Sequence, residues 1–232
     1  AGNSLQPSYS TAKILWYKEN LPEVYAKIDK ILQSNSYIAY KLTGVISQDV
    51  SQGYGLHCFD MKKACWDEEM CKLLGIPMEF LPEICDCDHV VGTVTGKAVA
   101  ECGLVEGIPV VAGGLDAACG TLGAGVIHSG ETQEQGGQAG GMSICTEEYK
   151  ADPRLILSYH VVPGKWLLQG GTTGGGGVMR WFEHEFADYE RMMKEQTGVS
   201  SLDQLNKIAE KVAPGCDGMV FLPYMSGERS PI

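Results

Sequence analysis

The first chemically suggestive segment joins two glycines to an acidic residue. Gly113 and Gly114 separate an apolar run at 108–112 from Asp116. A strand, two glycines, a carboxylate and a helix in this order place the carboxylate at the carboxyl end of a strand, where open α/β sheets bind ligands. There Asp116 could accept the proton of a substrate hydroxyl. The alternative is a helix N-cap, which aspartate also favours, and the residues alone favour the cap.

The second segment is Gly136-Gly137-Gln138-Ala139-Gly140-Gly141. In such a loop, backbone amides can approach an anion without interference from Cβ atoms. The sequence matches neither the Walker pattern nor the dinucleotide-binding fingerprint, so both of those sites are excluded. A plain hairpin turn is an equal alternative.

The third segment is a glycine-rich run, 170–177, that leads into a helix near Val178. Free amides and the helix dipole make such an N-terminus a suitable anion site. Four consecutive glycines are costly in conformational entropy, so we favour close approach of a ligand over a tight packing turn.

Hydrophobic spacing predicts the elements that position these segments. Helices are predicted at 11–32 (divided by Pro22), 35–42, 66–74 (capped by Asp67), 96–102, from 116, at 178–186 and at 202–212. Strands are predicted at 90–94, 108–112, 155–162, 165–168 and 218–222. The continuous apolar run at 108–112 predicts a strand buried on both faces of a parallel or mixed sheet. A composition shift near 123–125 marks the expected domain boundary.

Composition limits the classes of partner. Lys and Arg number 18 and Asp and Glu 29, which gives a net charge of −11 and disfavours both nucleic acid and anionic membranes. No stretch is apolar enough for a membrane span or a signal peptide, so we expect a cytoplasmic protein. The nine cysteines are odd in number and irregularly spaced, which is unlike a disulfide framework and fits a reducing compartment. No residue set predicts a metal site.

Several short motifs, taken in order, resemble one protein family. They are Lys13-Ile14-Leu15-Trp16, Tyr40-Lys41-Leu42-Thr43-Gly44, Val91-Gly92-Thr93-Val94, the strand before Asp116, Arg180-Trp181-Phe182 and Pro223-Tyr224-Met225-Ser226-Gly227-Glu228-Arg229-Ser230-Pro231. Together they resemble the FGGY carbohydrate kinases, most closely the xylulokinase-like members. The resemblance extends over nearly the whole chain, and the last motif is its most specific part.

The resemblance implies an α/β fold of the actin-like ATPase (ribonuclease H-like) type with two domains, only part of which is contained here. Residues 1–124 would be the second half of the N-terminal sugar-binding domain, and residues 125–232 the first part of the C-terminal ATP-binding domain. The implied activity is transfer of the γ-phosphate of ATP, accompanied by Mg²⁺, to a hydroxyl of a sugar or polyol. Pentuloses, gluconate and glycerol are all substrates within the family.

The resemblance also implies roles for individual residues. Asp116 matches the catalytic base, and this match reverses the preference for a cap. Ala117 stands where xylulokinases often have an asparagine that contacts the sugar. The implied nucleotide contacts are Gly137, Gln138, Ala139, Gly140, Gly176 and Arg180. The family usually has a hydroxyl residue in the loop at 137–140, which here is replaced.

Motifs expected at both ends of such a kinase have no counterpart in these residues, so we expect an internal fragment that is inactive alone. Two other hypotheses remain open. The altered loop at Gln138-Ala139 would suit a catalytically silent member that binds sugar or nucleotide. Alternatively, the chain is a structural fragment whose exposed surfaces pair with a second copy to form a homodimer.

Overall fold

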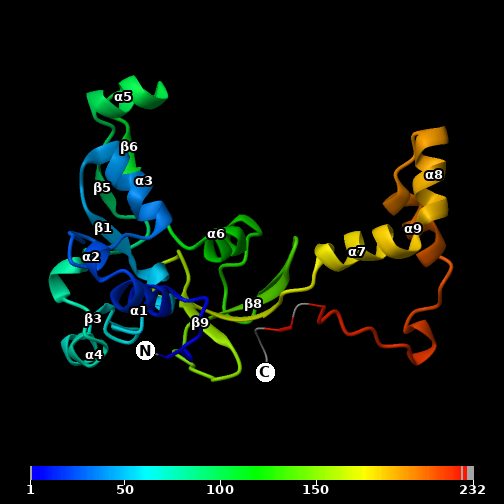
Figure 1. The fold of residues 1–232 in the computed structure, drawn as a ribbon, viewed down its shortest axis with the longest axis horizontal. Helices are drawn as coiled ribbons and strands as arrows, with labels where there is room; N and C mark the ends of the chain where they lie inside the picture. The colour runs from blue at the N-terminus through cyan, green and yellow to red at the C-terminus, as the bar shows by residue number, and fades with distance from the viewer. Residues whose placement is uncertain (1, 226, 229–232) are drawn as a thin grey trace. The chain divides into compact units, whose positions relative to one another are not determined.

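The computed structural model describes residues 2–225 and 227–228 (Figure 1). The chain forms two compact units. The first unit comprises Ala1–Gln133 and Ser143–Gln169, and the second comprises Glu134–Met142 and Gly170–Ile232. Residues 226 and 229–231 of the last sequence motif lie outside the described residues.

The first unit is a mixture of short helices and short strands. Its helices are α1 (Ser10–Asn20), α2 (Pro22–Tyr25), α3 (Ser34–Thr43), α4 (Glu68–Leu74), α5 (Gly96–Cys102) and α6 (Asp116–Gly123), with 3₁₀ turns at Val50–Gly55 and Met78–Phe80. Its strands are β1 (Ser47–Asp49), β2 (Phe59–Asp60), β3 (Cys65–Trp66), β4 (Glu83–Cys85), β5 (Val90–Thr93), β6 (Pro109–Val111) and β9 (Ile156–Tyr159). β1 and β4 are parallel, whereas β2 pairs with β3 and β5 with β6 in antiparallel fashion. α3 packs against β5, β6 and α5 (Figure 1).

A four-stranded sheet has the order β7-β8-β10-β9, and the division into units runs through three of its strands. These are β7 (Thr132–Gly136), β8 (Gly140–Thr146) and β10 (Trp166–Thr172). The second unit continues with α7 (Gly176–Phe186), α8 (Asp188–Thr197), α9 (Ser201–Ala209) and a 3₁₀ turn at Cys216–Gly218. α8 packs against both α7 and α9 (Figure 1).

Local signals in the sequence located most of the helices. The helix predicted at 96–102 has those bounds, and Gly103 ends it in the left-handed conformation at φ 73°. Asp67 caps α4 as predicted, because its carboxylate accepts a hydrogen bond from the backbone N–H of Met70 at 3.1 Å. The strands predicted at 155–162 and 165–168 are confirmed in position by β9 and β10, which pair in antiparallel fashion.

Two strand predictions are wrong. The run 108–112 is not a parallel strand buried on both faces: β6 pairs only with β5 among the described strands, and Val111 is 48% exposed. An apolar run indicates that a segment is buried, but it does not indicate which strand pairs with it. In the two-stranded sheet, one edge of β6 is unpaired among the described strands. Residues 218–222 form no strand, because no described strand hydrogen-bonds to them, and Val220 is 80% exposed.

Two apolar clusters hold the first unit together. The larger cluster contains the buried side chains of Ile14, Leu56, Cys58, Phe59, Met61, Cys71, Ile76, Leu81 and Leu157. The smaller one contains Leu115, Ala118, Val126, Cys145 and Leu167 and thereby joins α6 to the sheet. The apolar face of α6 is therefore fixed, while the start of the helix reaches the surface.

No helix in the described part of the chain is long and apolar enough to cross a membrane.

We predict that Leu157→Ala lowers the free energy of unfolding by about 2–5 kcal/mol, because Leu157 is fully buried and its removal leaves a cavity. Leu73→Ala is the matched control: Leu73 is 77% exposed, so the change should be below about 0.5 kcal/mol. Urea unfolding followed by tryptophan fluorescence measures both. Equal effects of the two substitutions would contradict the assignment of Leu157 to the core.

Candidate functional site

Asp116 is the first residue of α6, and its side chain is exposed. The residue at the N-cap is Leu115, so Asp116 is not the N-cap, although its Oδ1 accepts a hydrogen bond from the N–H of Ala117 at 2.7 Å. Ala117 is half-buried, and its carbonyl accepts the Thr121 hydroxyl at 2.8 Å. The arrangement presents one carboxylate to solvent on a helix whose remaining face is anchored.

The loop before Asp116 is tightly constrained. Gly113 has φ 78°, a conformation that residues with a Cβ rarely adopt. A Cβ on Gly114 would lie 2.4 Å from Cγ1 of Val161, so only glycine fits there without a shift. Leu115 is buried in the smaller apolar cluster. The two glycines thus serve the path of the chain into α6.

A buried polar group lies beneath this loop. Asp49 and Ser51 are both fully buried, and the Asp49 carboxylate accepts hydrogen bonds from the Ser51 N–H at 3.0 Å, the Ser51 hydroxyl and the Asn35 amide at 2.7 Å. The Cys87 thiol lies 3.7 Å from the same carboxylate. Burial raises the pKa of Asp49, although the hydrogen bonds from Ser51 and Asn35 oppose this rise. Burial also raises the pKa of Cys87, to about 12, so this thiol stays protonated at neutral pH.

The predicted nucleotide loop is the turn between β7 and β8, and it packs on the start of α7. The carbonyl of Gly137 accepts the Gly176 N–H at 2.6 Å. The carbonyl of Gln138 accepts the N–H groups of Gly175 and Gly177 at 3.1 and 3.2 Å. The first amides of α7, which the anion-site hypothesis requires to be free, therefore donate to the loop.

The run of glycines at 174–177 is explained by these close approaches. A Cβ on Gly175 would lie 2.5 Å from the carbonyl carbon of Ala139, and one on Gly176 would lie 2.7 Å from the Gly137 oxygen. A Cβ on Gly174 would lie 2.2 Å from the carbonyl oxygen of Pro223. Packing against backbone explains Gly174, Gly175 and Gly176, whereas a Cβ on Gly177 would overlap the side chain of Gln138.

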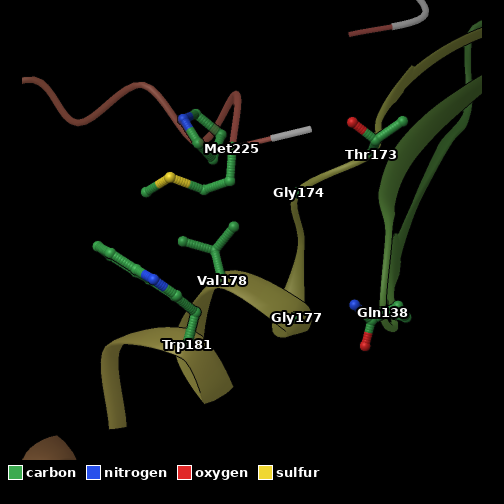
Figure 2. Close-up of a pocket in the computed structure, with 8 residues that line it drawn as sticks. Gln138, Thr173, Gly174, Gly177, Val178, Trp181 and Met225 are labelled. Atoms are coloured by element: carbon green, nitrogen blue, oxygen red, sulfur yellow. The ribbon is translucent and has the colours of Figure 1, made fainter. Parts of the chain in front are cut away.

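A cavity of about 210 Å³ lies beside the loop within the second unit. It is lined by Gln138, Thr173, Gly174, Gly177, Val178, Trp181, Pro223 and Met225 (Figure 2). Figure 2 shows the Gln138 side chain next to Gly177, with Val178 and Trp181 of α7 on the side of Met225. The volume is below the roughly 300–1,000 Å³ of pockets that enclose a whole small-molecule ligand.

The described part of the last sequence motif is tied to the end of β10. The Glu228 carboxylate accepts hydrogen bonds from the Thr172 hydroxyl and from the Thr173 N–H at 2.9 Å. The Thr173 hydroxyl donates to the Gly227 carbonyl at 2.6 Å. Glu228 therefore fixes the segment that enters the glycine run.

The predicted site residues fall into two groups. Asp116 and Ala117 belong to the first unit, whereas Gly137, Gln138, Ala139, Gly140, Gly176 and Arg180 belong to the second. The loop and Gly176 are brought together, and Arg180 is exposed one turn further along α7. Sequence reasoning missed Asn35, Asp49 and Ser51, which lie under the loop that precedes Asp116. Asp49 and Ser51 lie in a short polar segment, and hydrophobic periodicity cannot be recognised over so few residues.

Solved structures define the class of fold. The crystal structure of xylulose kinase from Rhodospirillum rubrum matches with a TM-score of 0.84 and 30% identity, over 98% of this chain and 45% of that one. Gluconate kinase from Lactobacillus acidophilus matches with a TM-score of 0.85 and 26% identity, over 99% of this chain and 45% of that one. The predicted fold class is confirmed: the chain has part of the actin-like ATPase fold of these kinases.

The chain belongs to the FGGY family of carbohydrate kinases. The family model for the N-terminal domain of these kinases matches residues 1–123, which is more than half of the chain. A gluconokinase from Bacillus licheniformis is 30% identical over 232 residues, which are 100% of this chain and 45% of the relative. The chain thus spans less than half the length of this relative, and the resemblance deduced from the motifs is confirmed.

We predict that Gly175→Ala lowers the free energy of unfolding of the second unit by about 1–3 kcal/mol, because the added Cβ would overlap the backbone of Ala139. Gly136→Ala, at the end of β7, is the matched control, since its Cβ would meet no described atom within 4 Å. Thermal unfolding with hydrogen exchange across the loop measures the difference. Equal stability of the two variants would show that the loop does not pack on α7 in this way.

We predict that the stability of the fold depends on pH through the buried carboxyl group of Asp49. The pKa of Asp49 is higher in the folded than in the unfolded protein. The contribution of its protonated carboxyl group to the free energy of unfolding is therefore complete below the unfolded pKa of 3.8, and it is lost as the pH rises through the pKa of the folded state. Asp49→Asn removes this titration. The unfolding free energy of the wild type minus that of Asp49→Asn should therefore fall as the pH rises. Urea unfolding of both proteins between pH 3.5 and pH 8 measures it, and a difference that grows with pH would contradict the raised pKa.

Proposed function

We propose that the intact protein is an ATP-dependent carbohydrate kinase of the xylulokinase-like type. The observation that carries this proposal is the exposed carboxylate of Asp116 at the start of a firmly anchored helix, in a chain of the FGGY family. The similar proteins named above are a xylulose kinase, a gluconate kinase and a gluconokinase, which supports a sugar or sugar acid as the acceptor.

Asp116 acts as the base in this proposal. The acceptor hydroxyl oxygen forms a bond to the γ-phosphorus of ATP while the bond from that phosphorus to the bridging oxygen breaks. The hydroxyl proton passes to the Asp116 carboxylate, and ADP leaves with the bonding electrons. Transfer through a loose transition state depends mainly on the position of the attacking oxygen, which the rigid start of α6 can control. Ala117, beside the base, offers the sugar no polar side chain.

The nucleotide would contact the loop at Gly137, Gln138, Ala139 and Gly140, with Gly176 and Arg180 nearby. The loop fits an anion in one respect: the amides of Gln138 and Ala139 donate to no acceptor within the described ranges. The Gln138 side chain supplies a further donor where the family usually has a hydroxyl. The adjacent cavity accommodates only part of a nucleotide.

Mg²⁺ would enter with the phosphates of ATP, whose charge it neutralises during transfer. Among the described residues, no group of three acidic, histidine or cysteine side chains is placed to hold a metal ion. Mg²⁺ in such sites commonly keeps several waters and takes few protein ligands, so these waters and the phosphates of ATP would supply most of its coordination.

A catalytically silent family member that binds sugar or nucleotide is the second candidate. It is favoured by the start of α7, where the amides of Gly175, Gly176 and Gly177 already donate to loop carbonyls. These amides would have to exchange partners before they could bind a phosphate. Binding of Mg-ATP without turnover would support this candidate.

The expected domain boundary at 124/125 is retained as part of the proposal, and the family match that ends at residue 123 supports it. The two units divide differently, since residues 125–133 and Ser143–Gln169 belong to the first unit. A cytoplasmic location and homodimer formation also remain predictions. Light scattering of the intact protein over a range of concentrations tests the second of these.

We predict that Asp116→Ala lowers kcat for sugar-stimulated ADP release by about 10²–10⁴-fold in the intact protein, because the proton of the attacking hydroxyl loses its acceptor. The dissociation constant for Mg-ATP should change by less than about threefold. A coupled ADP-release assay over ketopentoses, sugar acids and polyols gives the rates and identifies the substrate. Calorimetric titration gives the affinity.

Asp188→Ala is the control for this experiment, because Asp188 is likewise the first residue of a helix. It should leave kcat within about twofold of the wild type. Near-normal turnover of Asp116→Ala would exclude Asp116 as the base. Absence of turnover in the wild type, with Mg-ATP bound, would favour the silent binding protein.

A further inference from the structure

We propose that Ser51 and Asp49 are positioning residues for Asp116. A buried chain of hydrogen bonds runs from Asp49 through Ser51 to the backbone of Leu115, the residue directly before Asp116. The inference rests on the proposed function, in which Asp116 is the base, and it concerns the orientation of that base.

The Ser51 hydroxyl forms the central link. Its oxygen accepts the Leu115 N–H at 2.7 Å, and its proton is donated to the Asp49 carboxylate. A hydroxyl has one proton, so donation to Asp49 leaves the oxygen lone pairs to receive the Leu115 N–H. The two bonds therefore fix each other's direction.

Asp49 is itself held in place from both sides. One carboxylate oxygen accepts the Ser51 N–H at 3.0 Å, and the other accepts the Asn35 amide at 2.7 Å. The Asn35 amide also lies 3.4 Å from the carbonyl of Ala112, at the beginning of the loop that leads to Asp116. The polar group is thereby connected to both ends of the segment 112–115.

The start of α6 is consequently held by two different kinds of contact. The Leu115 side chain is buried in an apolar cluster with Ala118, whereas its N–H is bound to Ser51. Apolar packing of Leu115 fixes how deeply the start of α6 is buried but tolerates small rotations of the helix. The directional hydrogen bond to Ser51 limits these rotations. The backbone that carries Asp116 is thereby held in one position, and the Ala117 N–H is the described donor to its exposed carboxylate.

Loss of the Ser51 hydroxyl would leave the Leu115 N–H buried without its partner. The first turn of α6 would then move to find water or another acceptor. A displacement of about 1 Å in a reacting group costs up to ~10²-fold in rate. The expected consequence is a fall in kcat with little change in substrate affinity.

The test uses Ser51→Ala in the intact protein. We expect kcat to fall about 10–100-fold, while KM for ATP and for the sugar stays within about threefold, since neither substrate contacts Ser51. Ser51→Thr, which retains a hydroxyl, should recover part of kcat. Ser158→Ala is the matched control: Ser158 is equally buried, but its hydroxyl has no partner among the described residues, so kcat should not change.

Hydrogen exchange at Leu115 provides a readout that does not depend on catalysis. Its amide should exchange at least about tenfold faster in Ser51→Ala than in the wild type, and at the wild-type rate in Ser158→Ala. If Ser51→Ala does not fold, Asp49→Asn is used in its place. It should also raise the Leu115 exchange rate and lower kcat, each by a smaller factor.

The outcomes separate the two proposals. An unchanged Leu115 exchange rate, or a KM effect as large as the kcat effect, would overturn the positioning role. Faster exchange in Ser51→Ala with no turnover in the wild type would support the hydrogen-bond chain while rejecting the kinase activity. Faster exchange with a selective loss of kcat would support both.

Discussion

The hydrogen bond from the Leu115 N–H to the Ser51 hydroxyl is the constraint on which the proposed active site depends. It connects a helix start at the surface to a carboxylate buried deep in the first unit. A buried polar group of this kind is stable only when its partners are in place, so the arrangement has few alternatives. The rigidity of the base in our account comes from this requirement.

The second unit uses a different principle. Its loop and the start of α7 are joined by backbone groups, with glycine wherever two main chains approach most closely. Backbone groups make most of this contact, and the side chain of Gln138, in the segment where the family usually has a hydroxyl residue, also lies against Gly177. The replacement of that hydroxyl residue changes the set of donors offered to a phosphate. In our proposal, the hydrogen-bond donors of Gln138 and Ala139 therefore decide between a kinase and a silent binding protein.

The sequence predicted elements that carry their own local signals. α5 and α4 were located because Gly103 and Asp67 mark their ends. β1 was missed because its three residues are polar and buried, which reverses the usual hydrophobic signal. Asp49 and Ser51 were missed for the same reason: their importance comes from Leu115, 64 residues beyond Ser51 in the chain. The family resemblance predicts a role for Asp116, but only the structure shows which residues hold the backbone before it.

The most direct test of the account is a crystal structure of the intact protein with a non-hydrolysable ATP analogue and the sugar that its turnover identifies. We expect an Asp116 carboxylate oxygen to lie about 2.6–3.2 Å from the acceptor hydroxyl. We also expect this hydroxyl oxygen to lie in line with the bond from the γ-phosphorus to the bridging group. A hydroxyl that is bound instead by another carboxylate, with Asp116 directed to solvent, would show that Asp116 is not the base.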